Sequence, residues 1–325
     1  MKILITGGGG FVGCELTQSL LNENHEVTSL DLYLYGQELM PIHKNLTLVK
    51  GDIRNQTLLQ KIFKNQDIVI HLACISNDPS FELNPDLGKS INLDAFEPMV
   101  RIAKQSGVKR FIYASSSSVY GVKKELNVHE EMNLEPLTDY SKFKAMCEDI
   151  LLKYKTNEFE VVTVRPATVC GYSKRQRFDL VVNILTNLAY NTGKIIVFGG
   201  GQLRPNIHIR DMIEVYKVII SADSSLVNGK IFNAGGKNLT VHQLAGLVKK
   251  RLGDQVMIET KESNDNRSYH ISSEKIKKIL NFSTSFTVED AINDLKNAFD
   301  KKLFHDPLNN IKYYNIKLMN SIKLK

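Results

Sequence analysis

Tryptophan is absent from the 325 residues of this chain, and cysteine is scarce, with four in all. The cysteines lie far apart, without the paired spacing of metal sites or disulfide-rich domains, so we expect reduced thiols and no metal site. No apolar run reaches the roughly 18 residues that a membrane span needs. The first residues, MKILITGGGG, lack the basic and apolar segments of a signal peptide. These absences favour a cytoplasmic protein without a membrane span.

An excess of negative charge is missing as well, because the formal net charge is +7. Lysines along the whole chain carry this charge, with some concentration in a basic C-terminal tail, residues 306–325. Such a tail could contact nucleic acid or anionic lipid. A solvated or partner-packed segment explains it more simply, so we predict no nucleic-acid partner. The positive bias also suits an anionic substrate.

Near-continuous apolar runs alternate with helical stretches from the first residue onward. The segments KILIT, HEVTSLD, LTLVKGD, DIVIHLA, RFIYAS and EVVTVRP are typical of strands, and helices are expected between them, for example over 85–106 and 140–155. Strands rich in Val and Ile that alternate with helices indicate a parallel sheet covered on both faces. Right-handed crossovers then predict an α/β fold built on a doubly wound parallel sheet.

Beyond about residue 166 the pattern loosens into short strands, such as IIVFG, IHIRD, KIFNAGG and QVMIET, separated by helices. We interpret this part as a smaller α/β lobe interleaved with returns to the main sheet. The predicted division is a main domain over 1–166 with returns near 205–236, a second lobe over 167–204 and 237–305, and the tail over 306–325.

A glycine turn stands between the first strand and the first helix, in ITGGGGFVG. Gly7 permits the tight turn, Gly10 lets backbone approach a pyrophosphate, and Gly13 lets the helix pack close to the sheet. Phe11 and Val12 lie in the first helical turn, whose unpaired N–H groups and partial positive charge favour phosphate. The turn therefore predicts a nucleotide site.

Asp31 ends the second strand, where a carboxylate can accept hydrogen bonds from both ribose hydroxyls of an adenosine. The same charge would repel a 2′-phosphate, and residues 32–35 include no arginine to receive one. The glycine turn and this carboxylate together predict a dinucleotide site that takes NAD rather than NADP.

The fifth strand runs into four serines, residues 115–118, and DYSKFK further on places Tyr140 and Lys144 four positions apart. On a helix, positions i and i+4 share a face. An ammonium near a phenol favours the phenolate, so we expect Lys144 to lower the pKa of Tyr140 and make it a general acid/base. In a doubly wound sheet the carboxyl ends of the strands face the ligand, so the serines should line the same crevice.

The motifs TGGGGFVG, GDIR, HLAC, SSSSVYG, YSKFK, RPATVCG and RPNIHIRD, in this order, resemble those of the extended short-chain dehydrogenase/reductase superfamily. Within it, over residues 1–299, the chain is similar to the NAD-dependent nucleotide-sugar epimerases and dehydratases of the UDP-glucose 4-epimerase type. The resemblance implies a Rossmann-type fold with a smaller substrate-binding lobe and NAD as cofactor. It also implies a UDP-, GDP- or dTDP-linked sugar as substrate, and a homodimer.

The resemblance also implies roles for individual residues. Ser116 would hydrogen-bond the reacting sugar hydroxyl, Tyr140 would move its proton, and Lys144 would also hold the nicotinamide ribose. The positions expected to bind the cofactor are Gly7, Gly10, Phe11, Val12, Gly13, Asp31, Asp52, Ile53, Ala73, Asn92, Tyr140 and Lys144.

Substrate binding is expected from Ser116, Thr168, Arg177, Arg204 and Arg267. Arg204 matches the family arginine that grips the sugar-nucleotide diphosphate, for which a bidentate guanidinium is suited. Arg267 is a second candidate for the same phosphates. Arg177 and its neighbour Arg175 lie in the loop that, in the family, usually covers the nucleotide.

Dehydratases of this family carry an Asp-Glu pair directly after the catalytic hydroxyl residue, where this chain has Ser117 and Ser118. This departure argues against dehydration and favours 4-epimerisation, with transient oxidation at the sugar 4-position. A non-catalytic NAD-sensing protein on the same fold is a third hypothesis. It is disfavoured because the chain keeps Ser116, Tyr140 and Lys144.

The alternative enzyme is a net oxidoreductase, a nucleotide-sugar 4-dehydrogenase/reductase. Thr168 stands where an asparagine commonly contacts the substrate diphosphate, and Cys170 and Tyr172 replace the usual tyrosine and proline. The run RFDLVVN resembles a subgroup with dehydrogenases of surface-polysaccharide heptose or deoxysugar pathways. Both reactions therefore stay open at this point.

Overall fold

The computed structural model describes residues 1–76, 78–125, 127–263 and 268–322. Its main sheet has seven parallel strands, in the order β10-β6-β5-β4-β1-β2-β3. The strand order reverses beside β1, which is the doubly wound Rossmann arrangement, so the predicted fold class is confirmed. The strands are Lys2–Thr6 (β1), Glu26–Asp31 (β2), Leu46–Lys50 (β3), Ile68–His71 (β4), Arg110–Ala114 (β5), Glu160–Pro166 (β6) and Lys230–Ala234 (β10).

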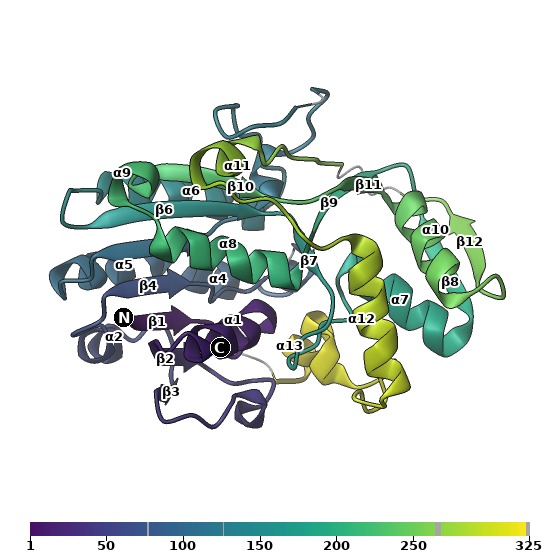
Figure 1. Cartoon of the computed structure of the whole chain (residues 1–325), viewed down its shortest axis with the longest axis horizontal. Coiled ribbons are helices and arrows are strands. Elements are labelled where there is room, and N and C mark those ends of the chain that lie inside the picture. Colours follow the sequence, from purple (N-terminus) through teal and green to yellow (C-terminus); the bar gives the residue numbers. More distant parts are fainter. Residues whose placement is uncertain (77, 126, 264–267, 323–325) are drawn as a thin grey trace.

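Two layers of helices cover the main sheet (Figure 1). Side chains from α1 and α8 share one buried cluster with the strands, and side chains from α2, α5 and α6 share another. Along β1, Ile3 and Ile5 belong to the first cluster and Leu4 to the second, which explains the unbroken apolar runs. These helices are Phe11–Asn22 (α1), Gln56–Ile62 (α2), Phe96–Gln105 (α5), Asp139–Lys153 (α6) and Ile209–Ser221 (α8).

The helix expected over 85–106 is interrupted. It forms as α4 (Pro85–Lys89), a π-helical turn (Ser90–Asp94) and α5. Within the π-helical turn, the amide of Asn92 accepts from Ile75 N and donates to Ile75 O, both at 2.9 Å. The turn therefore holds the loop that follows β4.

The second lobe is built from small sheets and three packed helices. One sheet has the order β11-β9-β7, and a second pairs β12 with β8. The strand expected over IHIRD ends earlier, at His208, because its Nδ1 accepts from Arg210 N (3.1 Å) and caps α8. The elements are Thr168–Cys170 (β7), Lys194–Phe198 (β8), Leu203–His208 (β9), Asn238–Thr240 (β11), Met257–Lys261 (β12), Val181–Thr192 (α7), Val241–Leu252 (α10) and Val288–Asp300 (α12).

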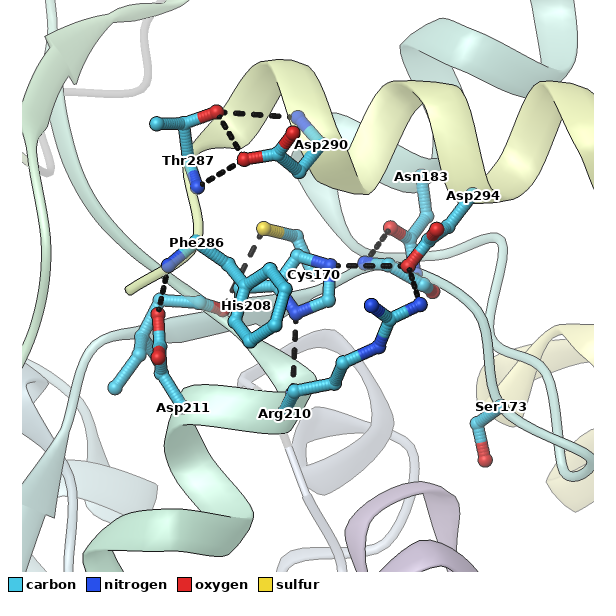
Figure 2. A network of polar contacts seen from close by, with 12 residues as sticks. Cys170, Ser173, Asn183, His208, Arg210, Asp211, Phe286, Thr287, Asp290 and Asp294 are labelled. Atoms are coloured by element: carbon cyan, nitrogen blue, oxygen red, sulfur yellow. Dashed lines mark hydrogen bonds and ion pairs between the residues drawn. The ribbon is translucent and has the colours of Figure 1, made fainter. Parts of the chain in front are cut away.

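A polar network ties the start of α8 to the segment that leads into α12 (Figure 2). The ring of His208 stacks on Phe286, with centroids 4.9 Å apart, and its Nε2 lies 3.2 Å from Asp294 Oδ2. The same carboxylate oxygen accepts from Arg210 (2.8 Å). Asp211 accepts from the backbone N–H groups of Ser285 and Phe286. His208 therefore has a structural role.

Residues 306–322, named here the C-terminal segment, are folded. They contain a short 3-10 helix (Ile311–Tyr313) and α13 (Asn315–Ile322), and α13 packs against α3 (Asp78–Glu82). In Figure 1, α13 lies between the main sheet and α12, so the chain returns from the second lobe to the first.

Four short elements complete the description: Gln37–Leu39 (η1), Ser117–Tyr120 (η3), Ser224–Val227 (α9) and Glu274–Leu280 (α11). Within the described residues, no helix is both long and apolar enough to cross a membrane.

Candidate functional site

A cavity of about 390 Å³ opens at the carboxyl ends of the main-sheet strands. This is where doubly wound sheets bind their ligands. It collects most of the predicted site residues. Those that line it are Gly7, Gly10, Phe11, Val12, Gly13, Asp31, Asp52, Ile53, Ala73, Ser116, Tyr140, Lys144, Thr168 and Arg177.

Two of the predicted site residues that the structure describes, Asn92 and Arg204, do not line this cavity. Asn92 is buried, and both ends of its amide bond to Ile75. Arg204 lies on β9, with its guanidinium 5.3 Å from the ring centroid of Tyr269, which does line the cavity. Arg267 lies outside the described residues.

The glycine turn has the close packing that the sequence predicts. Gly7 has φ +78°, and a Cβ on it would lie 2.6 Å from Ala73 N. A Cβ on Gly13 would lie 2.2 Å from Gly7 O, so no larger residue fits there. At the start of α1, Gly10 provides no capping side chain. The first-turn N–H groups are therefore open to an anion.

Asp31 is fixed at the end of β2 by backbone donors. Its two carboxylate oxygens accept from Gly9 N (3.0 Å) and Tyr33 N (2.7 Å). Burial raises the pKa of Asp31, and these two hydrogen bonds oppose that rise. The carboxylate keeps acceptor capacity on the cavity side, as ribose recognition requires.

Ser116, Tyr140 and Lys144 converge from two elements. The Ser116 hydroxyl lies 2.8 Å from Ser118 Oγ and accepts from Ser118 N at 3.1 Å, at the start of η3. Tyr140 and Lys144 lie on α6, which begins with a capping box between Thr138 and Ser141. The capping box fixes the start of α6, and the hydrogen bonds of Ser116 fix the segment after β5. The three side chains line one cavity.

Lys144 is 4% exposed, and its Nζ donates to Ala114 O at 2.6 Å. It lies 5.8 Å from the Tyr140 ring centroid and 5.0 Å from that of Tyr113. The expected lowering of the Tyr140 pKa is wrong for this structure. Desolvation raises the pKa of Tyr140 well above 10, Cys74 and Asp78 add to the rise, and Arg177 opposes it. Burial is the largest cause of this rise, and the Lys144 ammonium is bonded to a backbone carbonyl.

A buried ion pair joins the elements that carry Ser116, Tyr140 and Lys144. Glu148, one turn beyond Lys144 on α6, accepts two hydrogen bonds from Arg165 Nε (3.0 and 3.2 Å) and one from its Nη2 (2.6 Å). Ser115 donates to the same carboxylate. This arrangement joins the end of β5, helix α6 and strand β6, so it fixes Ser116 relative to Tyr140.

Several lining residues were not predicted from the sequence. Asp78 accepts from the Thr138 hydroxyl at 2.6 Å, which places a carboxylate at the N-terminus of α6. Tyr269 comes from the second lobe. Tyr35, Asn315 and Met319 also line the cavity. No local pattern marks these residues, because distant segments bring them together.

The comparison with known families agrees with this geometry. The sequence profile of the NAD dependent epimerase/dehydratase family matches residues 3–235. The chain belongs to this family. The match covers the glycine turn, the serines, Tyr140 and Lys144, and it includes most of the residues that line the cavity.

Similar proteins include enzymes named as epimerases and enzymes named as dehydratases. The chain is 25% identical to a UDP-glucose 4-epimerase of Lactobacillus helveticus, covering 72% of this chain and 76% of that protein. It is 26% identical to the human dTDP-D-glucose 4,6-dehydratase, covering 85% and 83%. The structure of UDP-glucuronic acid 4-epimerase from Bacillus cereus, in complex with UDP-glucuronic acid and NAD, superposes with TM-score 0.84 at 25% identity, covering 94% and 100%.

NAD is the cofactor of the epimerase/dehydratase family, and this cavity suits it. The open first turn of α1 suits a diphosphate, and Asp31 suits a ribose. The buried guanidinium of Arg175 lines the cavity, and its Nε and Nη1 have no hydrogen-bond partner among the described residues. Such orphaned donors in a cavity indicate an anionic ligand.

The described residues include no group of three or more His, Cys, Asp or Glu side chains that could hold a metal ion.

Proposed function

We propose that this chain is an NAD-dependent nucleotide-sugar 4-epimerase that uses Ser116, Tyr140 and Lys144. The observation that carries the proposal is that these residues share one cavity with the glycine turn. The two positions after Ser116 are serines rather than the Asp-Glu pair that the family's dehydratases carry. The relatives from Lactobacillus helveticus and Bacillus cereus, both named 4-epimerases, support it further.

In this mechanism, Tyr140 takes the proton from the sugar 4-hydroxyl while Ser116 hydrogen-bonds the same oxygen. Lys144 orients the end of β5 through Ala114 O and places a positive charge near the phenol. Bound NAD supplies the centre that accepts a hydride from the sugar and returns it, and its oxidised form adds positive charge. Tyr140 then gives the proton back after the keto sugar has turned within the cavity. No net redox change results.

Substrate binding falls to residues around the mouth of the same cavity. We assign Thr168 and Arg177 to it because both line the cavity, and Arg204 because it stacks on the cavity residue Tyr269. Arg177 is already paired, with Nε 2.8 Å from Asp179 Oδ1 and Nη1 3.1 Å from Ser76 Oγ. These contacts fix Arg177 in the wall of the site, where it would face the substrate, whereas Arg204 is assigned to the sugar-nucleotide diphosphate.

A net 4-dehydrogenase or reductase is the second candidate. Thr168 lines the cavity where relatives commonly carry an asparagine, so the substrate contact at this point differs from the usual epimerase contact. Such an enzyme would use the same Tyr140 proton transfer and would release the oxidised or reduced sugar.

One assay separates the two candidates. The purified protein is incubated with UDP-, GDP- and dTDP-linked sugars, while nicotinamide absorbance and product stereochemistry are followed. Epimer formation without accumulation of NADH is the expected result. Stoichiometric NADH with a 4-keto product would overturn the epimerase in favour of the dehydrogenase.

We also propose a homodimer through α6 and the helices after Pro85. Met146 and Leu152 on α6 are 46% and 50% exposed, so this helix presents two large apolar side chains at the surface. Size-exclusion chromatography with light scattering tests this, and a monomeric mass at micromolar concentration would contradict it. The cytoplasmic location stays a prediction.

A further inference from the structure

Arg175 is a buried cation whose pairing is incomplete. It is 2% exposed, and of its guanidinium nitrogens only Nη2 donates to a described residue, to Asn315 Oδ1. Its plane lies over the ring of Tyr35, 3.4 Å from the centroid. A buried guanidinium with free donors is unfavourable unless an anion satisfies it.

Arg175 lines the same cavity as the glycine turn and Asp31, the residues expected to bind the cofactor. Its loop is tied to the start of α1, because Ser173 donates to Phe11 O (2.8 Å) and Lys174 N donates to Glu15 Oε1 (2.9 Å). Arg175 is also close enough to Asp31 to oppose the rise in the pKa of that carboxyl. The free donors therefore lie beside the glycine turn and the ribose carboxylate, away from Arg204 on β9.

Asn315, the first residue of α13, joins the C-terminal segment to three loops around Arg175. Its Oδ1 accepts from Tyr35 Oη (2.9 Å) and from Arg175, and its Nδ2 donates to Ser76 Oγ (2.9 Å). Its backbone N donates to Asp179 Oδ2 at 3.0 Å. One turn further, Met319 lines the cavity and packs against the core of the main domain.

The rest of the C-terminal segment is docked independently of these bonds. Tyr314 packs in an aromatic cluster with Phe178 and Phe299, and its hydroxyl bonds to Asn187 and to Pro307 O. A change confined to the Asn315 amide should therefore leave the segment in place while releasing its hold on Arg175.

We propose that Arg175 binds the diphosphate of NAD, and that Asn315 latches the C-terminal segment across the adenosine half of the bound cofactor and slows its release. Asn315 acts as a positioning residue, because it fixes the guanidinium from one side while Tyr35 supports its plane. This inference concerns retention of NAD and does not depend on the reaction proposed above.

Cofactor exchange tests the latch directly. Each full-length variant is loaded with NADH and chased with excess NAD, while the fluorescence of bound NADH is followed. Asn315→Ala and Arg175→Gln should each release NADH about tenfold faster or more, as expected for loss of charge-assisted hydrogen bonds. The matched control is Asn309→Ala, in the same segment, whose exposed amide bonds only to Asp306. It should leave the rate unchanged.

The diphosphate contact has a separate test in equilibrium titration. Arg175→Gln should weaken ADP-ribose about tenfold or more and leave adenosine unchanged. Equal weakening of both ligands, or weakening of UDP instead, would overturn the assignment of Arg175. An unchanged NADH release rate in Asn315→Ala would overturn the latch. If Arg175→Gln does not fold, Arg175→Lys takes its place, since it keeps the charge and loses the planar donors.

Discussion

The two halves of the molecule differ in how their site residues are positioned. In the first half, the glycine turn, Asp31 and the serines follow the ends of strands in one parallel sheet, and they line one cavity together with Tyr140 and Lys144 of α6. In the second half, Arg204 lies on β9 of a three-stranded sheet, with its guanidinium 5.3 Å from the ring centroid of the cavity residue Tyr269. Strand ends of one parallel sheet meet at one edge, whereas the place of Arg204 depends on how the second lobe packs.

We expect the first half to supply the reacting groups and the second half to bind the substrate. The buried pair of Glu148 and Arg165 joins helix α6 to strand β6 in the first half. The second half contains the largely buried pair of Arg177 with Asp179 and exposed pairs such as Lys194 with Glu259. Substitutions in the first half should therefore have larger effects, and the following experiments test that ranking.

The largest effect is expected from Tyr140→Phe, which removes the acid/base hydroxyl and keeps the ring. Turnover should fall at least about a hundredfold, with NAD content unchanged. Because burial raises the pKa of Tyr140, the phenolate fraction grows with pH, so wild-type turnover should rise toward alkaline pH. The matched control is Tyr190→Phe, whose hydroxyl bonds to Asp300 in the second lobe. Near-normal activity of Tyr140→Phe would remove Tyr140 from the mechanism.

Glu148→Ala should give the next largest effect, on stability. It leaves Arg165 buried without its partner, which typically costs roughly 3–5 kcal/mol in the free energy of unfolding. Urea denaturation measures this value, and Glu259→Ala in the second lobe serves as the exposed control with no expected change. If both substitutions have equal effects, the proposed contrast between the halves fails.

A smaller effect is expected from pH acting on His71, in the core below the cavity. Burial, helped by Lys144, lowers the pKa of His71 to about 3. Between this value and about 6.5 the unfolded chain binds a proton that the folded chain excludes, so stability is present above about 6.5 and declines as the pH falls. The loss from about pH 7 to about pH 5 should be roughly 2 kcal/mol in the free energy of unfolding.

The same measurement on His71→Gln isolates this contribution. The difference between the two pH values should shrink in His71→Gln and persist in His305→Gln, a control at an exposed histidine. An unaltered pH dependence in His71→Gln would assign the acid sensitivity to other groups.

The smallest effect is expected from Arg204→Gln in the second lobe. The KM for the nucleotide sugar should rise about tenfold, with turnover and NADH release nearly unchanged. Arg251→Gln, at an exposed arginine of α10, is the control. If Arg204→Gln alters turnover more than KM, Arg204 acts on the reacting sugar, and the division of roles between the halves is wrong.

Sequence reasoning reached the residues whose relation is local or is set by strand ends. Tyr140 and Lys144 share a helical face, and the glycine turn joins consecutive elements, so each could be recognised within a few residues. Asn315 could not, because it lies 280 residues from Tyr35 and 140 from Arg175. The sequence also predicted the wrong direction for the shift of the Tyr140 pKa, because desolvation depends on every segment packed around the phenol.

By itself, the sequence determined the doubly wound sheet, the NAD-type glycine turn with its carboxylate, and the pairing of a phenol with an ammonium. These follow from periodicity and from short spacings, which the backbone converts into geometry without help from distant residues. Only the tertiary structure decided that Arg175 lines the same cavity as the glycine turn, that Asn92 supports a loop, and that Asn315 and Met319 of the last helix line the cavity. Such contacts arise from packing between remote segments, and packing energy carries no signature in local sequence.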